Sequence, residues 1–283
     1  MKLLFTVPHF YKPLDGIEYS ASSSSAQSRI DALNKLILAL HQQFGSLQYA
    51  LNYETGKPFQ ILEAPRHEIA IKICTTGDCH LLNQLSIPKN LYTHSPTSAE
   101  DLMLGFECHR ILQGDLGQYD YYCFMEDDLI IQDSYFFEKL KAFNRLFGPE
   151  NLLQPNRYEV SAGPPFIKVR LDGAIPMTAS QPFQDISQQR TLQLPFAGSL
   201  IKFQRAVNPH AGCFFLTHEQ MQYWVRQPYF LDKDVSFVGR HEGPTNAATL
   251  GIMKTFRVYK PVADSMNFLE IQHAAPRLVQ RIQ

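Results

Sequence analysis

The stretch YDYYCFMEDDLII, residues 119–131, places three consecutive carboxylates, Glu126, Asp127 and Asp128, in an otherwise apolar segment. Charged side chains are rarely taken into a protein interior unless another group pairs with them. The apolar residues ahead of the carboxylates indicate a buried strand, and residues i and i+2 of a strand face the same way. Glu126 and Asp128 can therefore point together into a cleft, while Asp127 turns aside or contacts a neighbouring loop.

Strand and helix patterns alternate around this segment. Strand patterns cover residues 2–8, 68–77 and 152–160, and helical spacing covers residues 29–45, 98–112 and 135–148. The predicted helix caps are Ser98 with Asp101, then Ser134, and Thr245 or Asn246. This alternation predicts an α/β fold with a mostly parallel central sheet flanked by helices. Ligands bind at the carboxyl ends of strands in such sheets, which puts the three carboxylates on the rim of a cleft.

The second half of the chain begins with a region of different character. Residues 161–207 are rich in Pro and Gly and show little periodicity, which predicts loop or irregular β-structure, such as a lid or a substrate-facing insertion. Regular patterns return with a strand and a helix over 210–227, a helix over 243–256 and a strand over 257–262.

Composition excludes several classes of protein. The chain has 283 residues and a formal net charge of -1, which argues against a general nucleic-acid binder. No apolar stretch approaches the roughly 20 residues of a spanning helix, so we predict no transmembrane segment. The odd number of cysteines fits free thiols in a cytoplasmic protein. Cys74, Cys79 and His80 lack the second pair that would complete a zinc site.

Two hard oxygen ligands on one strand face suit Mg²⁺ or Mn²⁺, whose other positions are filled by water and phosphate oxygens. Such an ion neutralises the charge that builds up on a departing diphosphate. The alternative is an exposed acidic strand end without a ligand.

At these residues the sequence resembles the A-type (GT-A) nucleotide-sugar glycosyltransferases, which carry an Asp-x-Asp motif at the end of an apolar strand after a Rossmann-like alternation. Glu126-Asp127-Asp128 matches that motif, with Glu in place of the first Asp. The resemblance implies a metal-dependent transfer of sugar from a UDP- or GDP-sugar to a carbohydrate or other hydroxyl acceptor. Asp128 matches the metal-ligating position, whereas Glu126 would touch the metal directly, act through water or hold the ribose.

The resemblance also implies roles for residues far downstream. Members of that fold often place a third metal ligand after the last core strand, where His273 stands in this sequence. Inverting, family-2-like members carry an acidic residue just before a helix that leads into a Tyr-x-Pro-like strand. Glu242 occupies that place, and Tyr259-Lys260-Pro261 follows. Whether His241 or Glu242 takes the proton of the acceptor hydroxyl stays open, and Glu242 could instead stabilise the helix N-terminus.

Further site residues follow from the same resemblance. The nucleotide would contact Pro8, His9, Thr75, Thr76, Asp78, Glu126 and Asp127. The acceptor would contact Asn208, His210 and Gly212. Each set could equally reflect ordinary turn chemistry.

The resemblance divides the chain into a nucleotide-sugar-binding half, 1–160, and an acceptor-binding half, 161–283, of one GT-A domain. Two alternatives remain. One is a nucleotidyltransferase or metal-dependent phosphoesterase on a related fold, although VPHFYKPLDG, residues 7–16, lacks the Gly-rich loop with a basic residue expected of sugar-phosphate nucleotidyltransferases. The other is a non-catalytic module that binds carbohydrate or calcium.

Overall fold

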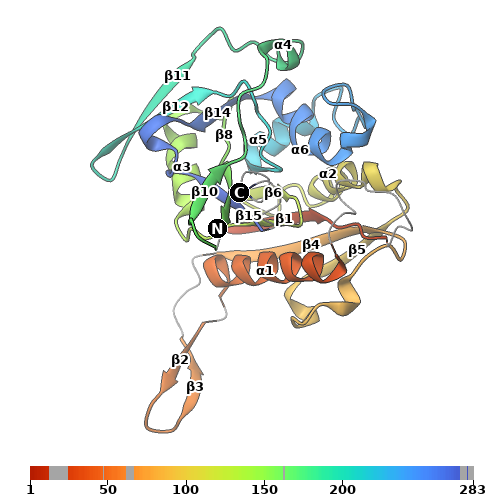
Figure 1. Cartoon of the computed structure of the whole chain (residues 1–283), viewed down its shortest axis with the longest axis vertical. Helices are drawn as coiled ribbons and strands as arrows, with labels where there is room; N and C mark the ends of the chain where they lie inside the picture. Colours follow the sequence, from red (N-terminus) through yellow and green to blue (C-terminus); the bar gives the residue numbers. More distant parts are fainter. Residues whose placement is uncertain (13–24, 47, 62–66, 162, 275–278, 280–283) are drawn as a thin grey trace.

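The computed structural model describes residues 1–12, 25–46, 48–61, 67–161, 163–274 and 279. Its central sheet has the strand order β13-β6-β1-β4-β5 (Figure 1). These strands are β1 (Lys2–Pro8), β4 (Glu68–Thr76), β5 (Thr93–Thr97), β6 (Tyr121–Met125) and β13 (Cys213–Thr217). All neighbours are parallel except β13, which runs antiparallel to β6. The predicted α/β class with a mostly parallel central sheet is confirmed.

Two hydrophobic cores lie on the opposite faces of this sheet because successive strand residues point to opposite sides. On β6, Tyr121, Cys123 and Met125 belong to one core, and Tyr122 and Phe124 belong to the other. The first core also contains buried residues of α1 (Ala26–Phe44) and α3 (Phe136–Phe147). The second contains residues of α2 (Leu104–Gly114), α5 (His218–Val225) and α6 (Gly243–Thr255). Figure 1 shows α1 on one side of the sheet and α2 and α6 on the other.

Two smaller sheets join distant parts of the sequence. One has the order β10-β9-β15-β7, from β7 (Leu129–Ile130), β9 (Asn156–Ser161), β10 (Ile167–Arg170) and β15 (Glu270–His273). The other has the order β11-β12-β14-β8, from β8 (Asn151–Leu153), β11 (Thr191–Phe196), β12 (Ser199–Arg205) and β14 (Arg257–Pro261). Because β7 follows the acidic triplet and pairs with β15, His273 lies opposite Leu129. The predicted boundary at residue 160 falls inside β9.

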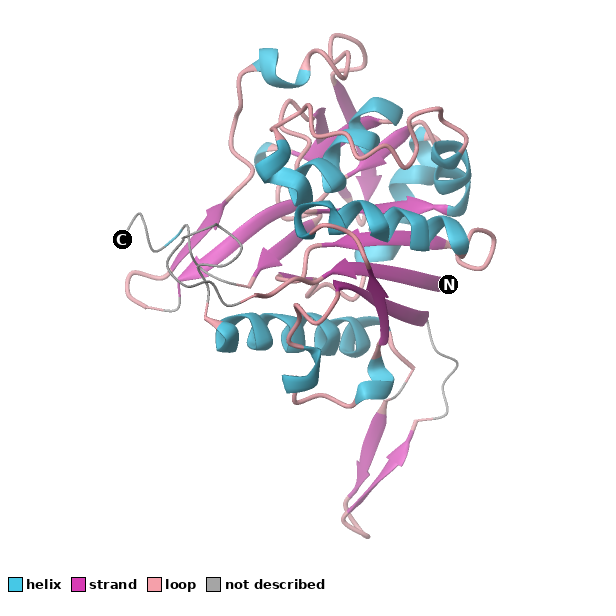
Figure 2. Ribbon diagram, turned by 90° about the vertical axis from the view of Figure 1, so that its right-hand side faces the viewer, coloured by secondary structure: helices cyan, strands magenta, loops and turns pink. Residues whose placement is uncertain are grey.

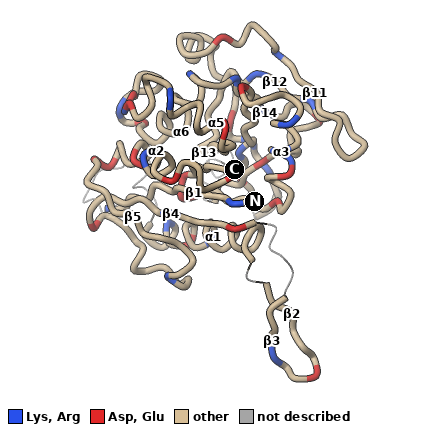
Figure 3. Tube along the Cα trace, turned by 180° about the vertical axis from the view of Figure 1, so that it is seen from behind, with Lys and Arg blue, Asp and Glu red and all other residues tan. Residues whose placement is uncertain are grey.

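The remaining elements are short. A separate hairpin of β2 (Tyr49–Asn52) and β3 (Lys57–Gln60) projects away from the body of the molecule (Figure 2). The short helix α4 is Met177–Ser180, and the 3₁₀ turns are η1 (Leu82–Gln84), η2 (Lys89–Leu91), η3 (Asp101–Met103), η4 (Arg240–Glu242) and η5 (Ala263–Ser265). Lys, Arg, Asp and Glu are interspersed along the trace (Figure 3). Among the described residues, no helix combines the length and apolar character that a membrane span requires.

Several local predictions were wrong in detail. Region 161–207 was expected to be loop or irregular β-structure; it contains the strands β10, β11 and β12, as the β part of that prediction allows, and also the short helix α4, which was not expected. The predicted strand 152–160 is split into β8 and β9 around Gln154 and Pro155. The expected Ser98–Asp101 capping box is absent, because the chain enters α2 through η3 and no side chain caps either element. Thr245 and Asn246 lie inside α6, which begins at Gly243.

Candidate functional site

The acidic triplet lies at the carboxyl end of β6, in the turn that leads into β7. The Glu126 N–H donates to the Gly212 carbonyl at 2.9 Å, at the start of β13. The Ala274 N–H donates to the Asp128 carbonyl at 2.7 Å, just after β15. The backbone therefore fixes the triplet between the central sheet and the β9–β15 sheet. This is the strand-end position that the sequence predicted.

Asp127 is buried between a histidine and an arginine. Its Oδ2 lies 2.6 Å from His9 Nδ1 and 2.5 Å from Arg29 Nη2. The Leu81 N–H donates to His9 Nε2 at 3.1 Å, so the ring carries its proton on Nδ1 and donates it to Asp127. Burial lowers the pKa of Arg29, but Asp127 and Asp128 outweigh this and raise it. Asp127 thus contacts the loop after β1, as expected, and fixes the start of α1 against that loop.

Asp128 meets His273 across the turn. Asp128 Oδ2 lies 3.2 Å from His273 Nε2, and Glu159 Oε1 lies 2.9 Å from His273 Nδ1 on the other side of the ring. Glu159 is fully buried, and its Oε2 accepts from the Val279 N–H at 2.8 Å. The fold therefore brings together two predicted metal ligands that are far apart in the sequence. It adds a buried carboxylate behind the imidazole.

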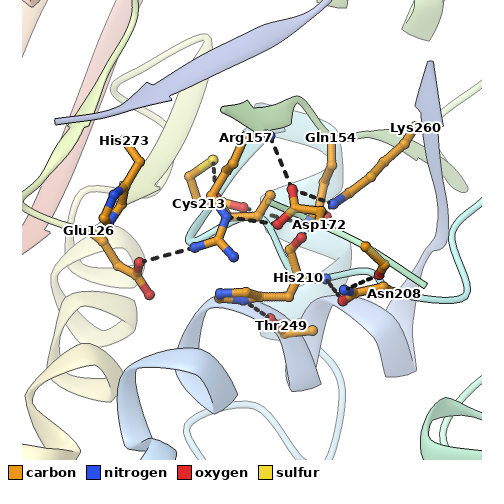
Figure 4. A network of polar contacts seen from close by, with 12 residues as sticks. Glu126, Gln154, Arg157, Asp172, Asn208, His210, Cys213, Thr249, Lys260 and His273 are labelled. Carbon is orange, nitrogen blue, oxygen red and sulfur yellow. Dashed lines mark hydrogen bonds and ion pairs between the residues drawn. The ribbon is translucent and has the colours of Figure 1, made fainter. Parts of the chain in front are cut away.

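Glu126 lies beside His273 and turns its carboxylate toward Arg157 (Figure 4). Glu126 Oε2 is 3.9 Å from Arg157 Nη1, which is too long for a hydrogen bond. Burial raises the pKa of Glu126 to about 7; Arg157 opposes this rise and the neighbouring Asp128 adds to it. Near pH 7 this carboxyl group is therefore poised between its protonated and ionised forms.

The metal prediction can be tested against these contacts. Within the described ranges, no three His, Cys, Asp or Glu side chains are arranged to hold a metal ion by themselves. Two ligands at right angles on an ion with bonds of about 2.1 Å lie ~3 Å apart, close to the separation of Asp128 Oδ2 and His273 Nε2. Metal-binding histidines usually donate their other N–H to a carboxylate, the position that Glu159 occupies. Asp128 and His273 therefore fit as two chain ligands, whereas Arg29, with Nη1 3.8 Å from Asp128, competes for the same carboxylate.

A second buried charge cluster adjoins Glu126 and consists of Arg157, Asp172 and Lys260 (Figure 4). Arg157 Nε donates to Asp172 Oδ1 at 2.8 Å, and Lys260 Nζ donates to Asp172 Oδ2 at 2.9 Å. Burial alone would raise the pKa of Asp172, but Lys260 and Arg157 hold it at about 2. Arg157 is thus anchored on Asp172 and presents its remaining N–H groups toward Glu126.

The predicted acceptor residues line the same region. His210 Nδ1 lies 3.0 Å from Thr249 Oγ1, and burial lowers the pKa of His210 well below its ordinary value. The Asn208 side-chain amide donates to the Gly173 carbonyl at 2.9 Å. Gly212 has a φ of +62°, and a Cβ atom there would lie 2.5 Å from Glu126 Oε2. Gly212 therefore lets the chain pass directly against the Glu126 carboxylate.

The predicted general bases lie just before the N-terminus of α6. His241 and Glu242 are exposed on η4, and Glu242 Oε2 accepts from the Thr245 hydroxyl at 3.4 Å. Glu242 precedes Thr249, the residue that contacts His210, by about 10 Å along the helix axis. Neither base candidate is part of the buried charge clusters around Glu126.

Apart from Glu126 and Asp127, the predicted nucleotide residues lie at the carboxyl ends of β1 and β4 or within two residues of them. Thr75 is buried, with Oγ1 2.7 Å from His94 Nε2, and Thr76 Oγ1 donates to the Ala99 carbonyl at 2.8 Å. Asp78 lies two residues beyond β4, and Pro8 ends β1 beside Cys74. These positions share the carboxyl edge of the central sheet with the acidic triplet.

Sequence reasoning missed five charged residues of the site, namely Arg29, Arg157, Glu159, Asp172 and Lys260. One signal was available. Arg157 and Glu159 are two positions apart on β9, so they share a face, and that face meets Glu126 and His273.

Comparisons with known proteins give only distant similarities. No family model matches the sequence, and no curated protein matches it significantly. HddC from Yersinia pseudotuberculosis is similar with a TM-score of 0.41 and 9% identity, over 100% of this chain and 99% of the other. The same protein complexed with GMP-PN gives a TM-score of 0.39 and 10% identity, over 95% and 97%. CMP:2-keto-3-deoxy-manno-octonic acid synthetase complexed with CTP gives 0.33 and 9%, over 81% and 79%. Because all three TM-scores lie below 0.5, none of these similarities assigns a function to this chain.

Proposed function

We propose that this chain is a metal-dependent glycosyltransferase that moves a sugar from a nucleotide-diphosphate sugar to a hydroxyl acceptor. The observation that supports it best is the alignment of Asp128, His273 and Glu159 at the carboxyl end of the central sheet. Metal-binding histidines commonly have a carboxylate on the ring nitrogen that does not face the metal, and Glu159 has that position on His273.

In this proposal Asp128 and His273 hold Mn²⁺ or Mg²⁺, and Glu126 is the third candidate ligand. When bound, the ion supplies positive charge against the leaving diphosphate. Glu159 fixes the His273 ring so that Nε2 faces Asp128. Arg29 and His9 hold Asp127 and so fix the turn that carries Glu126 and Asp128.

Two carboxylates are candidates for the general base that takes the proton of the acceptor hydroxyl. Glu242 has the position implied by the family resemblance, but it lies on the exposed turn before α6. Glu126 is the alternative base only if it does not ligate the ion: it lies beside the buried charge cluster, and its pKa of about 7 then suits proton transfer at neutral pH. In either case, attack opposite the diphosphate would invert the anomeric configuration.

A thermal-shift panel of UDP-, GDP-, CMP- and ADP-sugars with and without Mn²⁺ tests the proposal. We expect one nucleotide class to stabilise the protein only when Mn²⁺ is present, by about 2.7 kcal/mol at a hundredfold excess over Kd. Asp128→Ala should remove this shift, and Asp185→Ala, at an exposed position outside the site, should retain it. The absence of a shift with every donor, or an equal shift without metal, would contradict the proposal. Stabilisation by a nucleoside triphosphate instead would favour the nucleotidyltransferase alternative.

Turnover of the variants Glu242→Gln and Glu126→Gln then identifies the base. The variant that loses the base should lose turnover and still show the metal-dependent nucleotide shift. If Glu242→Gln retains full turnover, the role implied for Glu242 by resemblance is wrong.

A further inference from the structure

The β2–β3 hairpin stands apart from the rest of the molecule. It forms its own two-stranded sheet and extends away from α1 (Figures 1 and 2). Its large apolar side chains are exposed: Tyr49 by 58%, Leu51 by 52%, Tyr53 by 91% and Phe59 by 53%. An isolated two-stranded hairpin is at best marginally stable in water, and clustered exposed apolar residues mark an interaction surface.

The two edges of this hairpin differ in the backbone hydrogen-bond donors and acceptors that they present to another strand. The Ile61 N–H donates to the Gln48 carbonyl at 2.9 Å, so the backbone groups of Gln48 face β3. Antiparallel pairing alternates along the strand, and the backbone groups of Tyr49 and Leu51 therefore face outward. The opposite edge carries Pro58, directly across from Leu51, and proline has no N–H to donate. The β3 edge is thus blocked against pairing, whereas the β2 edge presents N–H and C=O groups with which no other described strand pairs.

We infer that β2 pairs antiparallel with β2 of a second copy of this chain, forming a four-stranded sheet with the order β3-β2-β2-β3. A two-fold axis through Ala50 sets Tyr49 opposite the partner's Leu51 and Leu51 opposite the partner's Tyr49. Tyr49 and Leu51 are also the residues whose N–H and C=O groups point outward. The same register therefore forms the backbone hydrogen bonds and sets the large side chains opposite each other. Four strands also exceed the three that a small sheet needs for independent stability.

The charges on the hairpin permit this self-association. Glu54 and Lys57 are the only Lys, Arg, Asp or Glu residues in 48–60, so the two hairpins meet without net charge. Tyr49 and Leu51 share one face of β2, and the two-fold axis continues that face across both copies. The paired segment is short, so the dimer should be weak and concentration-dependent, as small interfaces are. This inference does not depend on the proposed function.

Sedimentation velocity over a concentration series, with wild type and Leu51→Pro, tests the inference. The Leu51 N–H points away from β3, so proline removes a donor that the dimer needs and none that the hairpin uses. We expect wild type to show a monomer–dimer equilibrium and Leu51→Pro to associate at least about tenfold more weakly. Leu51→Val keeps the donor and should dimerise like wild type. A wild type that is monomeric throughout, or a proline variant that dimerises equally well, would overturn the inference.

A cysteine at the two-fold axis tests the register independently. Ala50 would face the partner's Ala50 in a non-hydrogen-bonded pair with Cα atoms about 4.5 Å apart, within the range of a disulfide. Ala50→Cys should therefore form a cross-linked dimer under mild oxidation. Leu200→Cys, at a 51% exposed position on β12, should form no such cross-link. Equal cross-linking of both variants, or of neither, would rule out this register.

Discussion

The acidic triplet and the Arg157–Asp172–Lys260 cluster are neighbours joined through Arg157. The pKa of a carboxyl group is shifted in opposite directions at the two places. Asp172 touches two cations and has a pKa of about 2, whereas Glu126 has carboxylates beside it, a distant arginine and a pKa of about 7. Burial disfavours the charged form at both places, so the difference lies in the number of nearby cations. Asp172 is therefore held in its charged form by two cations within hydrogen-bond distance, whereas Arg157, 3.9 Å away, does not offset the burial of Glu126.

The largest expected effect comes from breaking the Arg157–Asp172–Lys260 cluster. Asp172→Asn leaves Arg157 and Lys260 buried without their shared carboxylate, which should destabilise the protein by roughly 3–5 kcal/mol. Glu126→Gln is the matched control and should change stability by less than about 1 kcal/mol, because the Arg157 guanidinium, 3.9 Å away, is too far from Glu126 for a hydrogen bond. Urea unfolding of both variants measures the comparison. Equal losses would show that the two carboxylates play the same structural role.

The acid limb of the stability curve gives the next prediction. Because folding lowers the pKa of Asp172 from 3.8 to about 2, its stabilising contribution is complete above pH 3.8 and is lost as the pH falls through 2. The contribution amounts to roughly 2 kcal/mol. The difference in unfolding free energy between wild type and Asp172→Asn should therefore shrink by about this amount between pH 5 and pH 2. A difference that stays constant over this range would show that the carboxylate does not carry the effect.

The next prediction concerns Glu159, which contacts His273 beside the acidic triplet. If His273 binds a metal, Glu159→Gln removes the carboxylate that orients its ring and should weaken Mn²⁺ binding at least about tenfold, or 1.4 kcal/mol. Calorimetric titration with Mn²⁺ measures this change. Glu270→Gln, on the adjacent strand β15 and paired with Lys168 and Arg170, is the control and should bind Mn²⁺ like wild type. Unchanged affinity in Glu159→Gln would remove the main support for the metal site.

The sequence predicted β1, β4, β6 and β13 of the central sheet because these strands are rich in apolar residues whose pattern is visible locally, whereas the polar edge strand β5 was not predicted. The sequence also placed the acidic triplet at a strand end. The resemblance to GT-A glycosyltransferases led us to expect His273 and Asp128 in one site, and the two side chains do lie together. All five cysteines are free thiols, as predicted. The serine-rich sequence Ser22–Ser25 predicts a loop, but Ser22, Ser23 and Ser24 lie outside the described residues; Ser25 caps α1 by accepting from the Ser28 N–H at 3.2 Å.

The partners of the charged residues could not be predicted in the same way. Arg29 meets Asp127, and Lys260 meets Asp172, across long stretches of chain, and such pairs leave no local pattern. Helix starts were missed for a different reason. The predicted cap Ser134 does not cap α3; the preceding Asp133 accepts from the Tyr135 N–H at 2.9 Å. No side chain caps α3, because a Ser or Asp side chain before a helix can instead bond to an N–H group of the preceding turn, and sequence spacing does not distinguish these outcomes.

The smallest expected effect tests how closely the chain approaches Glu126. Gly212→Ala places a methyl group where φ is +62° and where the Glu126 carboxylate lies 2.5 Å away. Gly198→Ala is a matched control, because its φ is +79° but nothing lies within 4 Å of the new Cβ atom. Both variants should lose about 1 kcal/mol of stability from the backbone alone. Only Gly212→Ala should also displace Glu126 and lower turnover, so equal turnover in the two variants would show that the position of Glu126 does not matter to the reaction.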